Sequence, residues 1–326
     1  MGKAAKGSSG RDWTVADIPS QAGRRALVTG ANSGIGFYAA LELARTGAHV
    51  LMACRDAAKG EQAVTRLLAE VPEASVELVS LDLASLASVH ACAEAELTYG
   101  LPLDLLINNA GVMTPPHRME TADGFELQFG TNVLGHFALT ALLMPALERA
   151  AAAATARPRV VTLASVAHKT GKLHFDDLQY EIGYNPFTSY QQSKLADLMF
   201  AFELDRRLRV SDSRVMSLAA HPGVANTNLF KAHQYPAFEH AARRVVGVAI
   251  GLLLNSEADG ALPTLFAATA PDAVDGGYYG PQGFAEWRGG NVGPAKVARQ
   301  ALNHASAARL WTECEQLTGT RFVLGM

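Results

Sequence analysis

The sequence predicts a single-domain α/β fold, a doubly wound parallel sheet with helices on both faces. The first observation behind this prediction is that short apolar runs alternate with longer segments of helical periodicity from residue 22 onward. The second is that a glycine-rich turn joins the first apolar run to the first helical segment, as in Rossmann-type folds. The third is that no internal repeat or interdomain linker interrupts the alternation. One sheet with right-handed crossovers is therefore expected over residues 22–326.

Composition limits the classes of partner and compartment. With 326 residues and 49% hydrophobic content, the chain has enough apolar material for one large core. A net charge of −3 with interspersed signs argues against a nucleic-acid partner or an acidic membrane surface. The three cysteines, Cys54, Cys92 and Cys314, form no metal-binding or disulfide pattern. No metal is expected, and a reducing, cytoplasmic setting is the simplest one.

Two segments are tested for targeting or membrane insertion. The first ten residues are rich in Lys, Gly and Ser and lack the apolar core of a signal peptide, so residues 1–21 are interpreted as a flexible lead-in. The apolar run from Val245 to Leu254 is too short to cross about 30 Å of hydrocarbon as a helix. We therefore expect no transmembrane segment.

The first apolar run, Arg24 to Thr29, leads into the glycine-rich turn and then into a helix. Glycines there permit a tight bend and let the backbone approach a pyrophosphate, whose charge is met by free N–H groups at the helix N-terminus. A glycine trio alone is a weak signal, and the strand before it and the helix after it strengthen it. The predicted phosphate-binding residues are Gly30, Asn32, Ser33, Gly34, Ile35 and Gly36.

The second predicted strand, His49 to Cys54, ends where a dinucleotide fold meets the adenosine ribose. A carboxylate at that point binds the hydroxyls of NAD, whereas an arginine accommodates the 2′-phosphate of NADP. Cys54 stands where the carboxylate would be and Arg55 follows it, which favours NADP(H). Asp56 is the competing observation, because it could bind ribose hydroxyls. We interpret it instead as the N-cap of a helix over residues 57–70.

The alternation continues to the end of the chain. Further strands are predicted at residues 75–80, 104–107, 159–164, 214–220 and within 276–283; further helices are predicted at 85–98, 122–148, around and after Tyr190, and 295–318. Trp311 of the closing helix is expected in the core. The carboxyl ends of parallel strands meet at one edge, so one crevice should collect the residues at these ends, Gly30, Arg55, Asp82, Asn108, Ser165 and Pro222. Asp82 would either bind the adenine amino group or cap the next helix.

Tyr190 and Lys194 are spaced as neighbours on one helix face, at i and i+4. A free tyrosine has a pKa of about 10, and proton exchange near neutrality requires stabilising its ionised form by roughly 3–4 kcal/mol. An ammonium about 4 Å away at an effective dielectric of about 20 supplies roughly 4 kcal/mol. One lysine is therefore enough. Such a pair is common by chance, and its position after the elements above is what gives it meaning.

Six ordered motifs resemble the short-chain dehydrogenase/reductase family over residues 22–325. They are Thr29-Gly30-x-x-x-Gly34-x-Gly36, Asn108-Asn109-Ala110-Gly111, Asn132, Ser165, Tyr190-x-x-x-Lys194 and Pro222-Gly223. The stretches Ala53–Asp56, Lys59-Gly60 and Tyr190–Ala196 look most like its retinol-dehydrogenase-like branch, which generally prefers NADP(H). This resemblance implies a Rossmann-type fold and hydride transfer between a nicotinamide and a carbonyl or alcohol group.

The resemblance also implies roles for individual residues. Tyr190 would be the acid/base residue, and Lys194 would stabilise its ionised form and hold the nicotinamide ribose. Ser165 would hydrogen-bond the substrate oxygen, and Asn132 would support a water relay from Lys194. Further cofactor contacts are expected from Asp82, Leu83, Asn109, Ala110, Gly111, Pro222, Gly223, Val224 and Thr227.

The substrate side is less specified by the sequence. The loop between Ser165 and Tyr190 is longer than is usual in the family, and we hypothesise that it impedes the family's dimer contact, which leaves a monomer or a homodimer open. Residues 224–255 resemble a substrate lid. Candidate substrate contacts are Val166, His168, Tyr184, Phe187, Leu229 and Phe230. Ordinary core packing is an equally good interpretation of Leu229 and Phe230, and an exposed polar loop position is the simpler one for His168.

These observations predict an NADP(H)-dependent oxidoreductase acting on the carbonyl or alcohol group of a lipophilic small molecule. A second hypothesis keeps the cofactor and changes the acceptor to an imine or a C=C bond, because Tyr190 can protonate nitrogen or carbon. A third is a non-catalytic NADP(H)-binding redox sensor. Such a sensor does not need Ser165, Tyr190 and Lys194 together.

Overall fold

The computed structural model describes residues 12–153, 156–223, 255–287, 289 and 291–324. In this part of the chain, eight strands form one sheet in the order β3-β2-β1-β4-β5-β6-β7-β8. Neighbouring strands are parallel from β3 through β7. The strands are β1 (Arg25–Thr29), β2 (His49–Cys54), β3 (Val76–Ser80), β4 (Leu105–Asn108), β5 (Arg159–Leu163), β6 (Met216–Ala220), β7 (Tyr278–Pro281) and β8 (Val292–Pro294). The strand order reverses between β1 and β4, the switch point of a Rossmann-type fold, which confirms the predicted fold class.

The edge strand β8 is antiparallel to β7, whereas the sequence predicted a parallel sheet. The reason is the short connection between them, residues 282–291. A parallel neighbour needs a crossover of a dozen or more residues, usually with a helix, and ten residues suit a return in the opposite direction.

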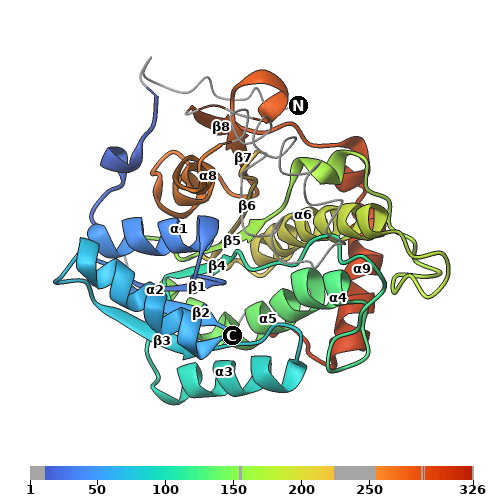
Figure 1. Ribbon diagram of the computed structural model, residues 1–326, viewed down its shortest axis with the longest axis horizontal. Helices are drawn as coiled ribbons and strands as arrows, with labels where there is room; N and C mark the ends of the chain where they lie inside the picture. The colour runs from blue at the N-terminus through green and yellow to red at the C-terminus, as the bar shows by residue number, and fades with distance from the viewer. Residues whose placement is uncertain (1–11, 154–155, 224–254, 288, 290, 325–326) are drawn as a thin grey trace, which may run out of the picture.

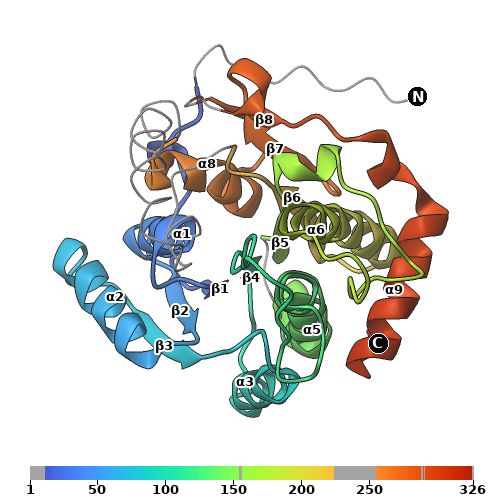
Figure 2. The ribbon, with the colours of Figure 1, turned by 45° about the vertical axis from the view of Figure 1, so that its right-hand side comes forward.

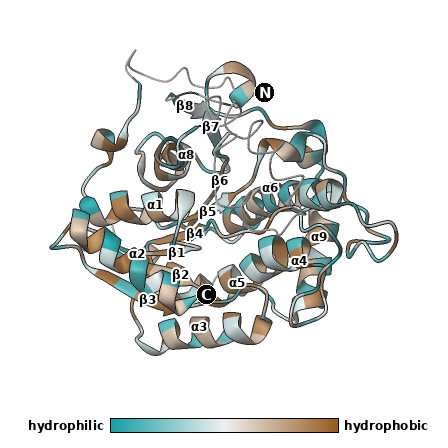
Figure 3. Ribbon diagram, in the orientation of Figure 1, coloured by the Kyte–Doolittle hydropathy of each residue, from teal (hydrophilic) through white to brown (hydrophobic). Residues whose placement is uncertain are grey.

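Helices cover both faces of the sheet (Figures 1 and 2). The apolar residues of α1, α2 and α8 pack on one face, and those of α3, α5, α6 and α9 pack on the other. The helices are α1 (Gly34–Arg45), α2 (Ala57–Glu70), α3 (Leu86–Thr98), α4 (Leu127–Phe129), α5 (Gly135–Ala153), α6 (Pro186–Val210), α8 (Glu257–Thr269) and α9 (His304–Thr318). In Figure 3 the outer helices α2 and α3 carry both hydrophilic and hydrophobic residues, as expected for helices with one buried face.

Two predicted helices differ from the observed ones. The helix predicted at residues 122–148 begins only at Leu127, and its residues Gly130–Leu134 form a π-helix before α5 continues to Ala153. The closing helix starts at His304 rather than at Ala295, because a short 3-10 turn, Arg299–Leu302, precedes it. Asn303 supplies the N-cap by accepting a hydrogen bond from the Ser306 N–H.

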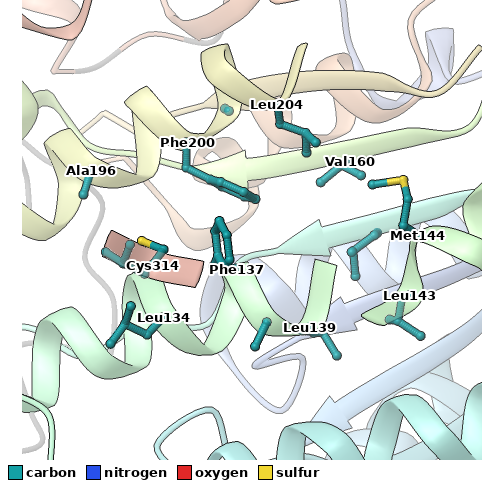
Figure 4. Packing of buried hydrophobic residues seen from close by; sticks show 14 of the residues in the cluster. Leu134, Phe137, Leu139, Leu143, Met144, Val160, Ala196, Phe200, Leu204 and Cys314 are labelled. Carbon is teal, nitrogen blue, oxygen red and sulfur yellow. The ribbon is translucent and has the colours of Figure 1, made fainter. Parts of the chain in front are cut away.

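An aromatic cluster joins α5, α6 and α9 (Figure 4). The ring of Phe137 lies 5.6 Å from that of Phe200 and 5.1 Å from that of Trp311, between centroids. Trp311 is only 2% exposed, which confirms its predicted place in the core. This packing fixes α6, the helix that carries Tyr190 and Lys194, against the body of the protein.

One continuous helical stretch in the described residues, Leu127–Ala153, has the length and apolar character that a membrane span would need. Its most apolar window is 89% buried inside the protein, where it packs against α3 and the sheet. Burial inside the fold accounts for its composition. The run that the sequence singled out, residues 245–254, lies outside the described residues.

Residues 12–21 are packed against the body, which corrects the expectation of a flexible lead-in for this part. The Trp13 ring meets that of Phe266 on α8 edge to face, with centroids 5.3 Å apart. Ile18 is 7% exposed and Gln21 is fully buried. The packed domain therefore begins before residue 22.

Candidate active site

A cavity of about 440 Å³ opens at the carboxyl ends of β1, β2, β4, β5 and β6. This is the edge where the sequence predicted a crevice. It is lined by most of the predicted cofactor residues, namely Gly30, Asn32, Ser33, Gly34, Ile35, Gly36, Arg55, Asp82, Leu83, Asn109, Ala110, Gly111, Tyr190, Lys194, Pro222 and Gly223. Val224 and Thr227 lie outside the described residues.

The glycine-rich turn packs against the end of β4. A Cβ at Gly36 would lie 2.4 Å from Nδ2 of Asn109 and 2.5 Å from the carbonyl oxygen of Gly30, so only glycine fits there. Asn109 Nδ2 donates to the Thr29 carbonyl over 2.7 Å, which ties the two strand ends together. Ser33 caps α1 without a side-chain hydrogen bond, so it leaves the first-turn N–H groups to an anionic ligand.

At the outer end of the cavity, β2 is followed by two exposed basic side chains, Arg55 and Lys59. Both carboxylate oxygens of Asp56 are engaged by Lys59. The Lys59 N–H donates to Oδ1 over 3.1 Å, and Lys59 Nζ lies 3.2 Å from Oδ2. The predicted N-cap role of Asp56 is thus confirmed. A capped and paired carboxylate is a poor acceptor for ribose hydroxyls.

Cys54, the last residue of β2, places no negative charge at the end of that strand. Burial raises the pKa of its thiol to about 11, and the sulfur accepts backbone N–H groups from Ala31 and Asn32. At neutral pH this position is therefore uncharged, in contrast to the carboxylate that would favour NAD.

Tyr190 and Lys194 both lie on α6 and both line the cavity, as their spacing predicted. The Lys194 ammonium is 6.0 Å from the centroid of the Tyr190 ring. It donates to the carbonyl oxygen of Leu163 at the end of β5 over 2.9 Å and to Oδ2 of Asp197 over 2.8 Å. The helix begins at Pro186, with Asn185 as N-cap, so Tyr190 sits in its second turn.

Ser165 follows β5 and caps a 3-10 turn, Val166–Lys169. Its hydroxyl oxygen accepts the Ala167 N–H over 3.2 Å. Because that contact uses an acceptor site, the hydroxyl proton stays free to be donated to a substrate oxygen in the cavity.

Asn132 lies behind the cavity wall, on the π-helix, and its side chain is used up by protein contacts. Oδ1 accepts the Val112 N–H over 2.8 Å, while Nδ2 donates to the Val112 carbonyl over 3.1 Å and to Ser193 Oγ over 3.0 Å. Asn132 thereby clamps the segment after β4 to α6. The sequence alone predicted an ordinary α-helix here.

His136 connects Asn132 to the cofactor side of the cavity. Thr29 Oγ1 accepts the N–H groups of Asn109 and Ala110, each over 2.9 Å, and its own proton has two acceptors in reach, the Ile107 carbonyl at 3.3 Å and, at the shorter 2.9 Å, Nε2 of His136. Nδ1 of His136 then carries the ring proton and donates to the Asn132 carbonyl over 2.9 Å. Burial, aided by the charge of Lys194, lowers the pKa of His136 to about 3, so the ring is neutral.

Three predicted substrate contacts do not line the cavity, and only Val166 does. His168 is fully buried, donates from Nδ1 to the Ser165 carbonyl over 2.6 Å and meets the Tyr278 ring edge to face. It is neither an exposed loop histidine nor a cavity residue; it holds the turn that presents Ser165. Leu229 and Phe230 lie outside the described residues, as does almost all of the predicted lid, residues 224–255.

The long loop before α6 is bound to the segment that precedes α4. The hydroxyl of Tyr184 donates to the Pro115 carbonyl over 3.2 Å, and Gln128 Nε2 lies 3.3 Å from it. Phe187, at the start of α6, is 68% exposed and is not among the residues that line the cavity. Tyr184 therefore fastens the loop to the segment before α4, and its predicted contact with substrate stays a prediction.

Sequence reasoning missed several residues that line the cavity or support it. Lys59 belongs to a stretch that the sequence comparison had already used, and its place one helical turn after Asp56 was a usable signal. Asp197 was visible at i+3 from Lys194. Thr29 and Ala53 likewise stand in motifs that the sequence comparison had used. The other missed residues carry no local signal; they are Leu81, Val112, Met113, Thr131, His136, Leu163 and Ala164.

A comparison with known protein families matches residues 24–235 to the short chain dehydrogenase model. This match spans well over half of the chain. The chain belongs to the short-chain dehydrogenase/reductase family.

Relatives and solved structures of this dehydrogenase agree with that assignment. It is 42% identical to mouse polyprenol dehydrogenase over 311 residues, covering 94% of this chain and 88% of the relative. It is 40% identical to human retinol dehydrogenase 13 over 307 residues, covering 92% and 87%. A crystal structure of an uncharacterized protein from Mycobacterium paratuberculosis is 40% identical with a TM-score of 0.76, covering 96% and 100%. The dehydrogenase is thus an alcohol or carbonyl oxidoreductase that uses a nicotinamide cofactor, in the retinol-dehydrogenase-like part of its family.

Proposed function

We propose that this dehydrogenase uses NADP(H) to interconvert the carbonyl and alcohol groups of a lipophilic small molecule, with Tyr190 as the acid/base residue. The observation that carries the proposal is one cavity lined by the glycine-rich turn, by Arg55 and by Ser165, Tyr190 and Lys194. A cofactor-binding surface and proton-exchanging side chains are thereby brought to the same edge of the sheet.

The residues around the cavity fit a dinucleotide. The bare backbone at Gly36 and the free N–H groups at the start of α1 suit the pyrophosphate. Lys194 lines the cavity with its third N–H available for the nicotinamide ribose. When bound, the nicotinamide supplies or accepts the hydride.

Preference for NADP(H) is proposed from the charges at the outer end. Arg55 and Lys59 offer two cations to a 2′-phosphate. The neutral thiol of Cys54 and the capped Asp56 leave no free carboxylate at the end of β2 to select NAD.

The chain's own groups then handle the proton and the substrate oxygen. In the reductive direction the Tyr190 hydroxyl donates its proton to the developing alkoxide, and the Ser165 hydroxyl hydrogen-bonds the same oxygen. Lys194 stabilises the tyrosinate that remains. In the oxidative direction the tyrosinate removes the alcohol proton. Asn132 joins the segment at Val112 to Ser193 of α6, the helix that carries Tyr190.

A lipophilic substrate is proposed from the wall beside Ser165. Val112, Met113 and Val166 make this part of the cavity apolar. The names of the mouse and human relatives, a polyprenol dehydrogenase and a retinol dehydrogenase, suggest long isoprenoid alcohols or their aldehydes as the first compounds to test.

The test follows the absorbance of NADPH and, separately, of NADH while retinal, an isoprenoid aldehyde, aryl ketones, cyclic imines and enones are added. NADPH consumption on the carbonyl compounds is expected. In Tyr190→Phe the rate should fall by about 10²–10⁴-fold, the usual contribution of a positioned acid/base group, with NADPH binding retained.

Tyr184→Phe is the matched control, because that hydroxyl lies on the adjoining loop and does not line the cavity. Its rate should stay close to that of the wild type. Turnover of only imines or enones would move the acceptor to C=N or C=C, and NADPH binding without any turnover would favour a redox sensor. A near-normal rate in Tyr190→Phe would remove the tyrosine from the mechanism.

Light scattering of the purified protein tests the expected monomer or homodimer. Ile182 of the long loop and Phe187 at the start of α6 are both exposed. These side chains would obstruct a dimer contact formed through α6. A tight dimer or tetramer would count against the hypothesis that the loop impedes the family's dimer contact.

A further inference from the structure

The buried partner of Lys194 is a carboxylate that the mechanism above does not use. Asp197 Oδ2 lies 2.8 Å from Lys194 Nζ, and the two residues are only 2% and 6% exposed. The pair stands on α6 one turn beyond Tyr190, with the Leu163 carbonyl as the second acceptor of the ammonium. The positive charge of Lys194 that acts on Tyr190 is therefore already partly offset by Asp197.

Within the described residues, no other ionised group couples to this pair. The titratable side chains that face it from neighbouring elements are His136 on α5 and Cys314 on α9, while Tyr278 on β7 faces Tyr190. Burial lowers the pKa of His136 to about 3 and raises the pKa of Cys314 and of Tyr278, so all three are neutral near pH 7.

Charges on the other elements packed against α6 are balanced elsewhere. Lys169 forms an ion pair with Glu286. Burial lowers the pKa of the nearby His168, and the charges of Lys169 and Glu286 have smaller effects on it. The Arg159 guanidinium on β5 donates to the Ala267 carbonyl. Asp197 is thus the anion that determines how much of the Lys194 charge Tyr190 experiences.

We propose that Asp197 is a positioning residue that tethers the Lys194 ammonium and offsets its charge, so that Tyr190 stays protonated to higher pH than the lysine alone would allow. The inference rests on the proposed function only for its kinetic test. Its physical basis is the ion pair itself.

The sign of the effect follows from the charges. Ionisation of Tyr190 adds a negative charge near Lys194, and a carboxylate already paired with that ammonium opposes the addition. Asp197 lies seven residues beyond Tyr190, about 10 Å along the helix. A unit charge at that distance and at an effective dielectric of about 20 displaces a titration by about one pH unit.

The variant Asp197→Asn keeps the shape and one acceptor oxygen and removes the charge. The pH at which kcat/KM for carbonyl reduction falls, and the pH at which kcat/KM for alcohol oxidation rises, should both move about one unit toward acid. Burial raises the pKa of Asp197 to about 6, so the wild type and the variant should become alike below that pH.

A second readout needs neither cofactor nor turnover. Tyrosines labelled with ¹³C at Cζ are titrated by NMR in the cofactor-free protein, and Tyr190→Phe identifies the signal of Tyr190. The midpoint of that signal should move about one unit toward acid in Asp197→Asn. If the protein does not turn over any carbonyl or alcohol, this arm still decides the inference.

Glu203→Gln is the matched control. Glu203 is a second buried carboxylate on α6, paired with Arg206 and Arg207 and remote from the cavity lining. It should leave both profiles unchanged. Should Asp197→Asn fold poorly, Asp197→Ser serves in its place. Unshifted midpoints, or midpoints moved toward alkaline pH, in folded Asp197 variants would overturn the proposal.

Discussion

Two lysine–aspartate pairs with the same spacing stand at opposite ends of the cavity. At the outer end, Asp56 and Lys59 on α2 lie 3.2 Å apart with side chains 44% and 67% exposed. At the catalytic end, Lys194 and Asp197 on α6 lie 2.8 Å apart with side chains 8% and 3% exposed. An exposed pair contributes about 0–1 kcal/mol and is screened by salt, whereas a buried pair cannot lose one partner cheaply. The same sequence spacing therefore gives an ion pair with little effect on stability at the outer end and one that stability depends on at the catalytic end.

The largest expected effect comes from removing the buried lysine. Lys194→Met leaves Asp197 buried without a counter-ion, which should lower the free energy of unfolding by about 3 kcal/mol and abolish most turnover. Urea unfolding at pH 7.5 measures the first and NADPH consumption the second. Adding Asp197→Leu to Lys194→Met should restore much of the stability and none of the activity.

Lys59→Met is the counterpart at the outer end. It should leave the free energy of unfolding close to that of the wild type, because its partner is solvated. A loss of stability equal to that of Lys194→Met would show that the two pairs do not differ as their burial indicates.

The next effect concerns the exposed cations and the cofactor. Arg55→Ala should weaken NADPH binding by about 10-fold, the value of one hydrogen bond to a charged group, and leave NADH binding nearly unchanged. The loss should shrink in high salt, because this end of the cavity is open to solvent. Fluorescence titration at two ionic strengths measures both. Equal losses for NADPH and NADH would mean that Arg55 does not contact the 2′-phosphate.

A pH dependence of stability is expected from a buried histidine that directly precedes the cavity-lining Pro222. Burial lowers the pKa of His221 to about 3, while its Nδ1 accepts the Gly223 N–H over 3.1 Å. Below the unfolded pKa of about 6.5 the unfolded chain binds this proton and the folded one does not. Stability is therefore fully present above that pH and falls by up to about 1.4 kcal/mol per unit as the pH drops toward 3.

His221→Asn keeps an acceptor for Gly223 and removes the titration. The pH dependence of the urea midpoint between pH 6 and pH 4 should become shallower by one proton. An unchanged slope would mean that His221 takes up its proton without unfolding.

Sequence patterns were sufficient where structure depends on neighbours along the chain. The glycine-rich turn, the Asp56 cap and the spacing of Tyr190 and Lys194 are local, and each lies where it was predicted. The order of strands and helices followed from the alternation of apolar runs. The fold class was therefore predictable, whereas the edge strand β8 was not predicted and the closing helix begins nine residues later than expected.

Patterns were insufficient where burial or long-range contacts decide the outcome. His168 is polar and follows the end of a strand, and its burial depends on Tyr278 and on Ala298, which is 130 residues further along. The link from Thr29 through His136 to Asn132 joins side chains about a hundred residues apart. No spacing rule contains such contacts, so the supporting residues were missed, as were several cavity-lining residues outside the motifs.

The π-helical turn at Gly130–Leu134 amounts to one residue inserted into an otherwise regular helix. Deleting a residue from it would let the helix close with ordinary hydrogen bonds. It would also rotate everything before the turn by about 100° relative to α5, so Asn132 and His136 could no longer both reach their partners, Ser193 and Thr29. In this protein, a shorter and more regular helix should thus lose these contacts. We expect neither a deletion nor an insertion at this turn to be tolerated.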